Sequence, residues 1–129
     1  MSSIAFFTLD PEHTDSPDEI RFLPTRYAAS LWAPGTLNGP AVCALAARAA
    51  ERGHSVAGFR PARFTIDLFK VARDIPTATR GRLLRDGGRI KVAEVEVEVG
   101  LTDYYFSPAV LTLTLATRGR TPCAQDSKR

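Results

Sequence analysis

Apolar residues recur along this chain with different periods, and each period predicts one kind of element. Short apolar runs at 4–9 and 20–23 are typical of brief β-strands. Between residues 41 and 52, Val42, Leu45, Ala46 and Ala49 have the i, i+3, i+4, i+7 spacing of one buried helix face. Alanines at 41, 44, 47 and 50 keep the rest of the surface small, so the pattern predicts a narrow helix that other elements can approach closely.

The boundaries of this helix are predicted by the residues at its two ends. Asn38 or Gly39 is expected to be the N-cap, because both residue types favour that position. Pro40 then falls in the first turn, where its missing N–H costs nothing. The helix is expected to run to about Arg52, with Gly53 as its terminator.

After the helix the apolar period changes to two, which is the period of β-strands. Four strands are expected, near 63–69, 78–84, 89–99 and 111–116, and Phe64, Ile66 and Leu68 share one face of the first. The residues 85–88 suit a hairpin turn. Apolar residues change parity within 89–99, so Ala93 is expected to mark a bulge or a change of the covered face.

The predicted order is two short β-segments, one long helix and four longer strands, which is an α+β pattern. An antiparallel sheet curled around the single helix would bury both apolar patterns. The 129 residues suffice for one domain with a core and are too few for two of ordinary size. We expect this domain to span 1–118, followed by a disordered tail at 119–129.

Composition and charge exclude several classes of protein. The apolar share of 44% and the charged share of 24% are ordinary for globular domains. No apolar run approaches the roughly 20 residues that cross a bilayer, and the N-terminus has no basic region typical of a secretory signal. The net charge of +3 is weak for a nucleic-acid binder. We therefore expect a cytoplasmic protein with no membrane span and no nucleic-acid partner.

Cysteine and histidine usage points away from disulfides and metal sites. Cys43 and Cys123 form no disulfide framework, and His13 and His54 are isolated, so no metal or other cofactor is expected. Cys43 could act as a nucleophile one turn into the helix, but a cysteine among alanines is more often inert core. No serine lies in a Gly-x-Ser-x-Gly sequence, and the glycine loop lacks the Lys-Ser/Thr of a nucleotide P-loop.

The loop at 31–40, which opens the helix, carries the most chemistry. It contains two glycines and two prolines. The backbone at Asn38, Gly39 and Ala41 gathers N–H groups at a helix N-terminus, where negative charge is favoured. The loop therefore predicts a site for a phosphate or for an oxyanion.

Four segments of the chain occur in an order that is known from one protein family. They are the loop 34–40 with its helix, Arg60-Pro61 before the strand at 63–70, the turn Arg85-Asp86-Gly87, and the strand segment 92–96. Together they resemble the thioesterase-like superfamily, and more narrowly the amino-terminal hotdog half of TesB-like acyl-CoA thioesterases. The resemblance covers roughly 22–100. It implies a single hotdog fold, in which an antiparallel sheet of five or six strands wraps around one central α-helix.

The resemblance also implies acyl-CoA as substrate, bound where two hotdogs pair. The family's frequent His-Gly-Gly corresponds here to Asn38-Gly39-Pro40, which places the thioester carbonyl near the helix N-terminus. The N–H of Gly39 is then expected to polarise this carbonyl, since a preformed donor stabilises the oxyanion as it develops. Asn38 is expected to orient a water molecule or the carbonyl. Asp67, the acid within a predicted core strand, is the candidate base, with pairing to Arg63 or a solvated position as alternatives.

The expected substrate-binding residues fall into three groups. Gly35 and Thr36 belong to the loop before the helix. Trp32, Phe64 and Phe69 are aromatic residues that, together with Tyr27, could line an acyl channel. Arg85 and Arg89 are basic residues that could meet the phosphates of CoA.

Departures from the family pattern keep a second function open. The working residues of TesB-like enzymes lie in the second hotdog, and the helix here has no carboxylate at 43–50. The pattern is also lost after Gly100. The leading hypothesis is hydrolysis of an acyl-CoA thioester by a homodimer or larger homo-oligomer, because one curved sheet leaves an open edge and an incomplete site. The alternative is a non-catalytic hotdog that binds acyl ligands or serves in assembly.

Overall fold

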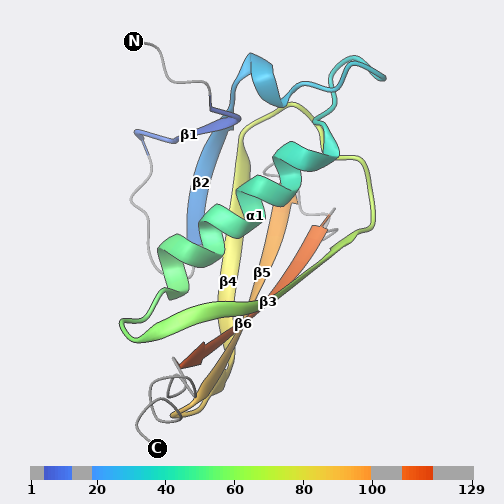
Figure 1. The fold of residues 1–129 in the computed structure, drawn as a ribbon. Coiled ribbons are helices and arrows are strands. Elements are labelled where there is room, and N and C mark those ends of the chain that lie inside the picture. Colours follow the sequence, from blue (N-terminus) through green and yellow to red (C-terminus); the bar gives the residue numbers. More distant parts are fainter. Residues whose placement is uncertain (1–4, 13–18, 100–108, 118–129) are drawn as a thin grey trace, which may run out of the picture.

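One helix lies across a curled, six-stranded antiparallel sheet (Figure 1). The computed structural model describes residues 5–12, 19–99 and 109–117. The strand order across the sheet is β1-β2-β4-β5-β6-β3. The elements are β1 (Phe7–Leu9), β2 (Glu19–Pro24), the 3-10 helix η1 (Arg26–Ala28), α1 (Gly39–His54), β3 (Phe59–Leu68), β4 (Thr77–Asp86), β5 (Ile90–Val99) and β6 (Ala109–Thr117).

This architecture confirms the α+β hotdog prediction and the predicted order of elements. Predictions that concern the residues before Ala5, the histidine His13, the segment 101–108 and the tail at 119–129 lie outside the described residues. Within the described ranges, no helix is both long and apolar enough to cross a membrane.

The core forms between one face of α1 and the inner face of the sheet. The predicted stripe of Val42, Leu45, Ala46 and Ala49 is buried, as expected from its spacing. It packs in one cluster with inward-pointing residues of β2, β5 and β6, namely Ile20, Phe22, Val95, Val97, Leu111, Leu113 and Leu115. Because six of the sixteen residues of α1 are alanine, the sheet can curl closely around the helix.

The irregularity predicted at Ala93 lies in the neighbouring strand instead. Ala93, Val95 and Val97 are all buried on one face of β5, so this strand does not change its covered face. The register shift occurs in β4 between Leu83 and Arg85, directly opposite Ala93. The prediction was wrong about the strand because Ile90 and Val92 are apolar residues on the other, less buried face of β5, so their parity does not mark a change of the covered face.

The prediction that Gly53 ends the helix was also wrong. Gly53 lies within α1, which continues to His54. The C-cap is Ser55, whose backbone N–H donates to the carbonyl oxygen of Glu51 at 3.1 Å and whose hydroxyl donates to the same oxygen. This side-chain cap satisfies a carbonyl at the helix end without a left-handed glycine.

Several strands extend beyond their predicted bounds. β3 begins at Phe59 and includes Pro61, next to a register shift between Pro61 and Arg63. β4 continues through Asp86, so the hairpin turn is shorter than the predicted 85–88 and closes with Gly87 N–H donating to the carbonyl oxygen of Ile90 at 3.0 Å. Proline is tolerated in β3 because the strand lies at the edge of the sheet.

Candidate functional site

Asn38 holds the start of α1 in place. Its Oδ1 accepts a hydrogen bond from the backbone N–H of Ala41 at 2.7 Å, which makes it the N-cap. Its Nδ2 donates to the carbonyl oxygens of Tyr27 at 3.1 Å and Ala29 at 3.4 Å. The side-chain amide therefore joins the first helical turn to the segment around η1.

Gly39 carries the one free backbone donor in the first turn of α1. The N–H of Asn38 donates to the carbonyl oxygen of Ala28 at 2.8 Å, and that of Val42 donates to the carbonyl oxygen of Asn38 at 3.2 Å. Ala41 donates to the cap, and Pro40 has no N–H. Among the described residues, only the Gly39 N–H at this helix end meets no acceptor, so it is available to a ligand oxygen.

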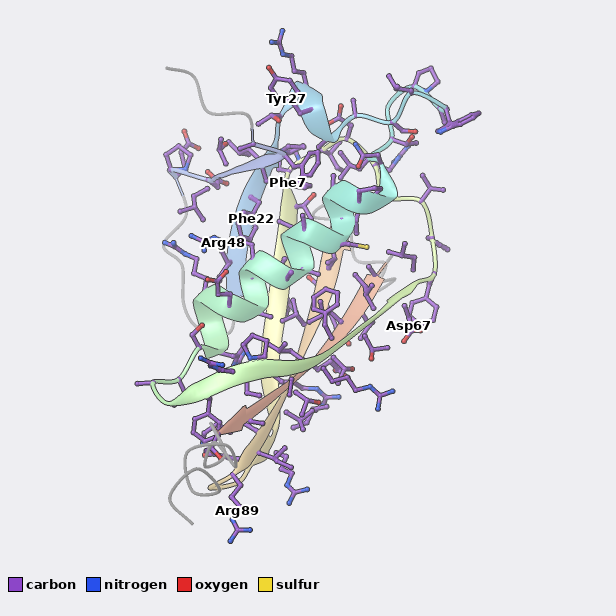
Figure 2. The ribbon with its side chains drawn as sticks, viewed as in Figure 1. Phe7, Phe22, Tyr27, Arg48, Asp67 and Arg89 are labelled. Carbon is purple, nitrogen blue, oxygen red and sulfur yellow. The ribbon has the colours of Figure 1, made fainter. Side chains whose placement is uncertain are left out.

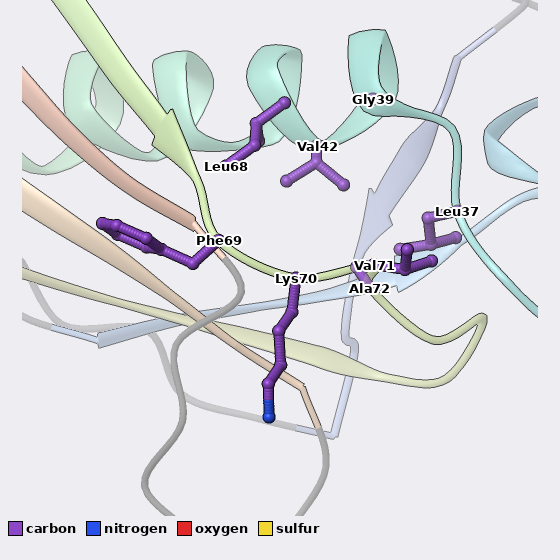
Figure 3. Close-up of a pocket in the computed structure, with 8 residues that line it drawn as sticks. All are labelled: Leu37, Gly39, Val42, Leu68, Phe69, Lys70, Val71 and Ala72. Atoms are coloured by element: carbon purple, nitrogen blue, oxygen red, sulfur yellow. The ribbon is translucent and has the colours of Figure 1, made fainter.

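Gly39 lies beside a cavity of about 330 Å³ between α1 and the chain that follows β3 (Figure 3). This cavity, the first-turn cavity, is lined by Leu37, Gly39, Val42, Leu68, Phe69, Lys70, Val71 and Ala72. The side chains that line it are apolar apart from Lys70, whose side chain extends away from Gly39 in Figure 3, and polar atoms supply a large part of the cavity surface. The arrangement can accommodate an apolar group and offer one N–H to an oxygen atom.

Backbone hydrogen bonds fix the wall of the first-turn cavity to the loop before the helix. Leu37 N–H donates to the carbonyl oxygen of Ala72 at 2.8 Å, and Asp74 N–H donates to the carbonyl oxygen of Gly35 at 2.9 Å. A β-bridge joins Thr36 to Arg73. The two segments thus form one continuous wall, although they are far apart in the sequence.

A second cavity, the far cavity, lies under the other half of α1. Its volume is about 310 Å³, and it is lined by Ala47, Ala50, Glu51, Ser55, Val56, Phe59, Pro61, Phe64, Leu113 and Leu115. Ile66, which lies between Phe64 and Leu68 on the same face of β3, packs against the core. Both cavities therefore lie between α1 and the inner face of β3, and we call this space the groove between α1 and β3.

Comparison of the sequence with protein-family models identifies the family of this chain. Residues 28–121 match the family model described as the acyl-CoA thioesterase N-terminal domain. The chain belongs to this family. It is thus a thioesterase-like hotdog protein. No protein among those with curated descriptions matches the chain in sequence.

Solved structures of bacterial proteins share the hotdog fold. A Streptococcus mutans protein bound to acetyl-CoA is 17% identical, with a TM-score of 0.66 over 92% of this chain and 94% of its own. A thioesterase from Haemophilus influenzae is 16% identical, with a TM-score of 0.63 over 85% and 76%. A Bacillus halodurans protein with CoA is 15% identical, with a TM-score of 0.63 over 79% and 69%. At such identities the likeness shows the fold alone.

The thioesterase-like fold places two of the expected residues together at the first-turn cavity. Gly39 and Phe69 both line it, and Phe69 is 61% exposed. Phe64 lines the far cavity instead. The two phenylalanines of the expected acyl channel therefore lie at opposite halves of the groove beside β3.

The expected loop residues shape the approach to α1. Gly35 has a φ of 75°, a conformation that glycine adopts without strain. The hydroxyl of Thr36 donates to the carbonyl oxygen of Ala33 at 2.6 Å, which closes the loop. Trp32, in the same loop, is 96% exposed. Their roles in substrate binding stay predictions.

Asp67 does not line either cavity. Leu68 and Phe64 face α1. Successive side chains of a strand point to opposite faces, so Asp67 lies on the outer face of the sheet. It is exposed, and it forms no ion pair with Arg63 among the described residues. Figure 2 shows Asp67 at the edge of the molecule near the end of β3. Its role as the base stays a prediction.

Arg85 and Arg89 lie at the opposite end of the sheet from Gly39. They flank the turn between β4 and β5, and strand register places this turn beside the start of β3 near Phe59. Figure 2 shows Arg89 at the far tip of the molecule. Contact between these arginines and a CoA held at Gly39 of the same chain would require a ligand that spans the sheet lengthwise.

Most residues that line the first-turn cavity were not predicted from the sequence. Leu68 was detectable, because its parity matches that of Phe64 and Ile66. Val71 and Ala72 follow the strand in an irregular segment, where no periodic signal exists. Their position depends on the bridge to the loop before α1.

Proposed function

We propose that this chain binds an acyl-CoA thioester with the carbonyl oxygen on the N–H of Gly39 and hydrolyses it to a free acid and CoA. The observation that carries the proposal is the free N–H of Gly39 beside a cavity at the helix N-terminus whose lining side chains are mainly apolar. Family membership supports the substrate class. The positive end of the helix dipole adds to the stabilisation of a developing oxyanion.

In the proposed reaction, water adds to the carbonyl carbon and the carbonyl oxygen becomes an oxyanion. The oxyanion then collapses, the carbon–sulfur bond breaks, and the CoA thiolate leaves and takes up a proton. Gly39 would stabilise the intermediate, and Asn38 would keep that donor aimed by capping the helix. A base must accept one proton from the water.

Asp67 is the base that we propose from the sequence, and substitution tests this role directly. It adjoins Leu68, which lines the first-turn cavity, but its carboxylate lies on the other face of β3. Comparison of Asp67→Asn with Asp67→Ala separates the loss of a base from the loss of a polar side chain. A base role requires both variants to lose about 100-fold or more in kcat, and unchanged kcat would assign the base elsewhere.

A second candidate function is acyl-CoA binding without turnover. The observation that favours it is the lining of the first-turn cavity, in which the described residues include no carboxylate, imidazole or hydroxyl group. A panel of acyl-CoA esters with colorimetric detection of the free thiol distinguishes the two. Turnover on any chain length supports hydrolysis, whereas saturable binding of a non-hydrolysable analogue with no turnover selects the binding function.

We also propose that the site is completed in a homodimer through the free edge of β3. Among the described strands, β3 pairs only with β6, so a ten-residue edge remains open. Open edges of this length are commonly covered by another strand. Leu68 and Phe69 are exposed beside this edge, and pairing would shield the groove between α1 and β3 from water. Light scattering of the purified protein measures whether it is a dimer.

A further inference from the structure

A third cavity lies on the side of α1 that faces away from β3. Its volume is about 250 Å³, and it is lined by Ala5, Phe6, Phe7, Phe22, Ala44, Leu45 and Arg48. We name it the β1 cavity, because β1 and the residues just before it contribute to its wall. Within the described part of the chain, it shares no lining residue with the first-turn cavity or the far cavity. It is therefore a separate space, outside the groove between α1 and β3.

The period of the helix explains this separation. Ala44 and Arg48 lie four positions apart, so they project from the same face of α1 and are about 6 Å apart along its axis. Ala47 and Ala50, which line the far cavity, fall on the opposite face. Figure 2 shows Arg48 on the side of α1 that carries β1 and β2, across the helix from Asp67.

Aromatic side chains form the wall opposite the helix. The rings of Phe7 and Phe22 meet edge to face, with centroids 6.4 Å apart and an interplanar angle of 78°. Phe22 is buried in the core, whereas Phe6 is 38% exposed. The wall therefore extends from the core to the surface, so hydrocarbon that enters from the solvent can leave water against these rings.

Arg48 gives this apolar space a single charge. Among the described residues that line the β1 cavity, it alone is charged. Its Nη1 lies 3.2 Å from Oε2 of Glu51, in a pair whose side chains are 58% and 65% exposed. An exposed pair of this kind contributes little, because water screens both charges. A guanidinium has five N–H donors, so Arg48 can bind a second carboxylate without releasing Glu51.

The chemistry of the lining selects one class of ligand. Aromatic and aliphatic walls bind hydrocarbon, and an arginine beside them binds a carboxylate through two parallel hydrogen bonds. The volume is below the roughly 300–1,000 Å³ of sites for drug-sized molecules, so the ligand must be small. A sugar or other polyol would lose its hydrogen bonds to water against the phenylalanines. The lining therefore fits a carboxylate with a short apolar body.

We propose that the β1 cavity binds a small apolar carboxylate. The carboxylate would lie on the guanidinium of Arg48, and the hydrocarbon would lie between Ala44 and the rings of Phe7 and Phe22. Alanine at position 44 keeps this space open, because a longer side chain there would fill it. Binding at this site involves no reaction and does not depend on hydrolysis at Gly39.

Isothermal titration calorimetry of the full chain with octanoate tests this site, with octanol as the uncharged counterpart. Wild type should bind octanoate saturably and octanol at least about tenfold more weakly. Arg48→Gln should raise the Kd for octanoate by about tenfold or more. Arg48→Lys should raise it less, since lysine keeps the charge but loses the paired hydrogen bonds. Ala44→Leu should abolish binding and keep the fold, because position 44 is exposed and leucine favours helix.

NMR locates the bound molecule and separates this site from the groove. On titration with octanoate, the methyl resonances of Ala44 and Leu45 should shift in wild type and stay in place in Arg48→Gln. The methyl groups of Leu68 and Val71 report on the first-turn cavity independently. Lys70→Gln is the matched control, because it removes the cation that lines the first-turn cavity, and it should leave the shifts of Ala44 and Leu45 unchanged.

Three results would overturn the proposal: no saturable binding of octanoate to wild type, an affinity that Arg48→Gln and Ala44→Leu leave unchanged, or shifts at Leu68 and Val71 alone. Thermal unfolding of every variant controls for folding. The titrations contain no thioester, so failure at the β1 cavity and failure of the proposed hydrolysis are observed separately.

Discussion

The side-chain oxygen of Asn38 lies 2.7 Å from the backbone nitrogen of Ala41, while the amide nitrogen of the same side chain lies 3.1 Å from the carbonyl oxygen of Tyr27. One residue therefore caps the helix and anchors the preceding segment to it. With Ala41 satisfied in this way, the free donor of the first turn is the N–H of Gly39.

Asn38→Ala should destabilise the fold by about 1–2 kcal/mol, since it removes both the cap and the anchor. Asn38→Ser should lose less, because a serine hydroxyl can still cap the helix but cannot reach the carbonyl oxygens of Tyr27 and Ala29. Chemical denaturation of the three proteins measures the difference. An alanine variant as stable as wild type would contradict the capping role.

Gly81→Ala should destabilise the protein through His54. A Cβ at position 81 would overlap Nε2 of His54 and lie 3.1 Å from its Cδ2, so the imidazole must move from its place against β4. We expect a loss of about 1–3 kcal/mol, typical of overpacking. In a His54→Ala background the same change should cost less than about 0.5 kcal/mol, which a double-mutant cycle measures. Equal costs in both backgrounds would show that the two positions are independent.

Phe64→Trp should shorten the acyl chains that the protein accepts. Phe64 lines the far cavity, at the opposite half of the groove from Gly39, and its ring is 45% exposed, so a larger side chain fits without disturbing the core. If a long acyl chain runs along β3 to this cavity, kcat/KM for long chains should fall by about tenfold, as expected for the loss of two buried methylene groups. Short chains and the Phe64→Leu variant serve as controls. A uniform effect on all chain lengths would place the acyl chain elsewhere.

Cys43→Ala should leave thioester hydrolysis and stability nearly unchanged. The side chain is half-buried in α1 and lines neither cavity. Steady-state rates with and without a thiol-alkylating reagent provide the measurement. A loss of about 100-fold or more in the alanine variant would instead indicate a covalent mechanism through this cysteine.

The elements of the fold were predictable because each carries its own period. The helix stripe and the alternation in β5 and β6 are strong signals, since burial on one face requires them. Helix and strand ends were less predictable. The helix is capped at Ser55 and does not end at Gly53, because a serine C-cap has no strong sequence signal. The register shift in β4 depends on the pairing of this strand with β5 next to Ala93, which the sequence does not give.

The candidate site was predictable only where it depends on local backbone chemistry. Asn-Gly-Pro before an alanine-rich helix predicted the cap and the donor, and both involve residues close in sequence. The cavity beside Gly39 requires Val71 and Ala72, which reach the helix through pairing with the loop at 36–37. Non-local pairing in irregular segments has no period, so these residues could not be found from the sequence.

The most direct measurement compares Gly39→Pro with Gly39→Ala in the steady-state hydrolysis of acyl-CoA. Proline removes the N–H at position 39. The fold should accept proline there, because Asn38 already has the extended conformation, with φ of −75° and ψ of 151°, that the residue before a proline adopts. Alanine keeps the N–H, and its Cβ would lie in ordinary contact, 3.8 Å from Cδ1 of Leu68. We predict that proline lowers kcat by about 100-fold or more while alanine changes it less than about tenfold. Equal rates for the two variants, with both folded, would contradict an oxyanion site at Gly39.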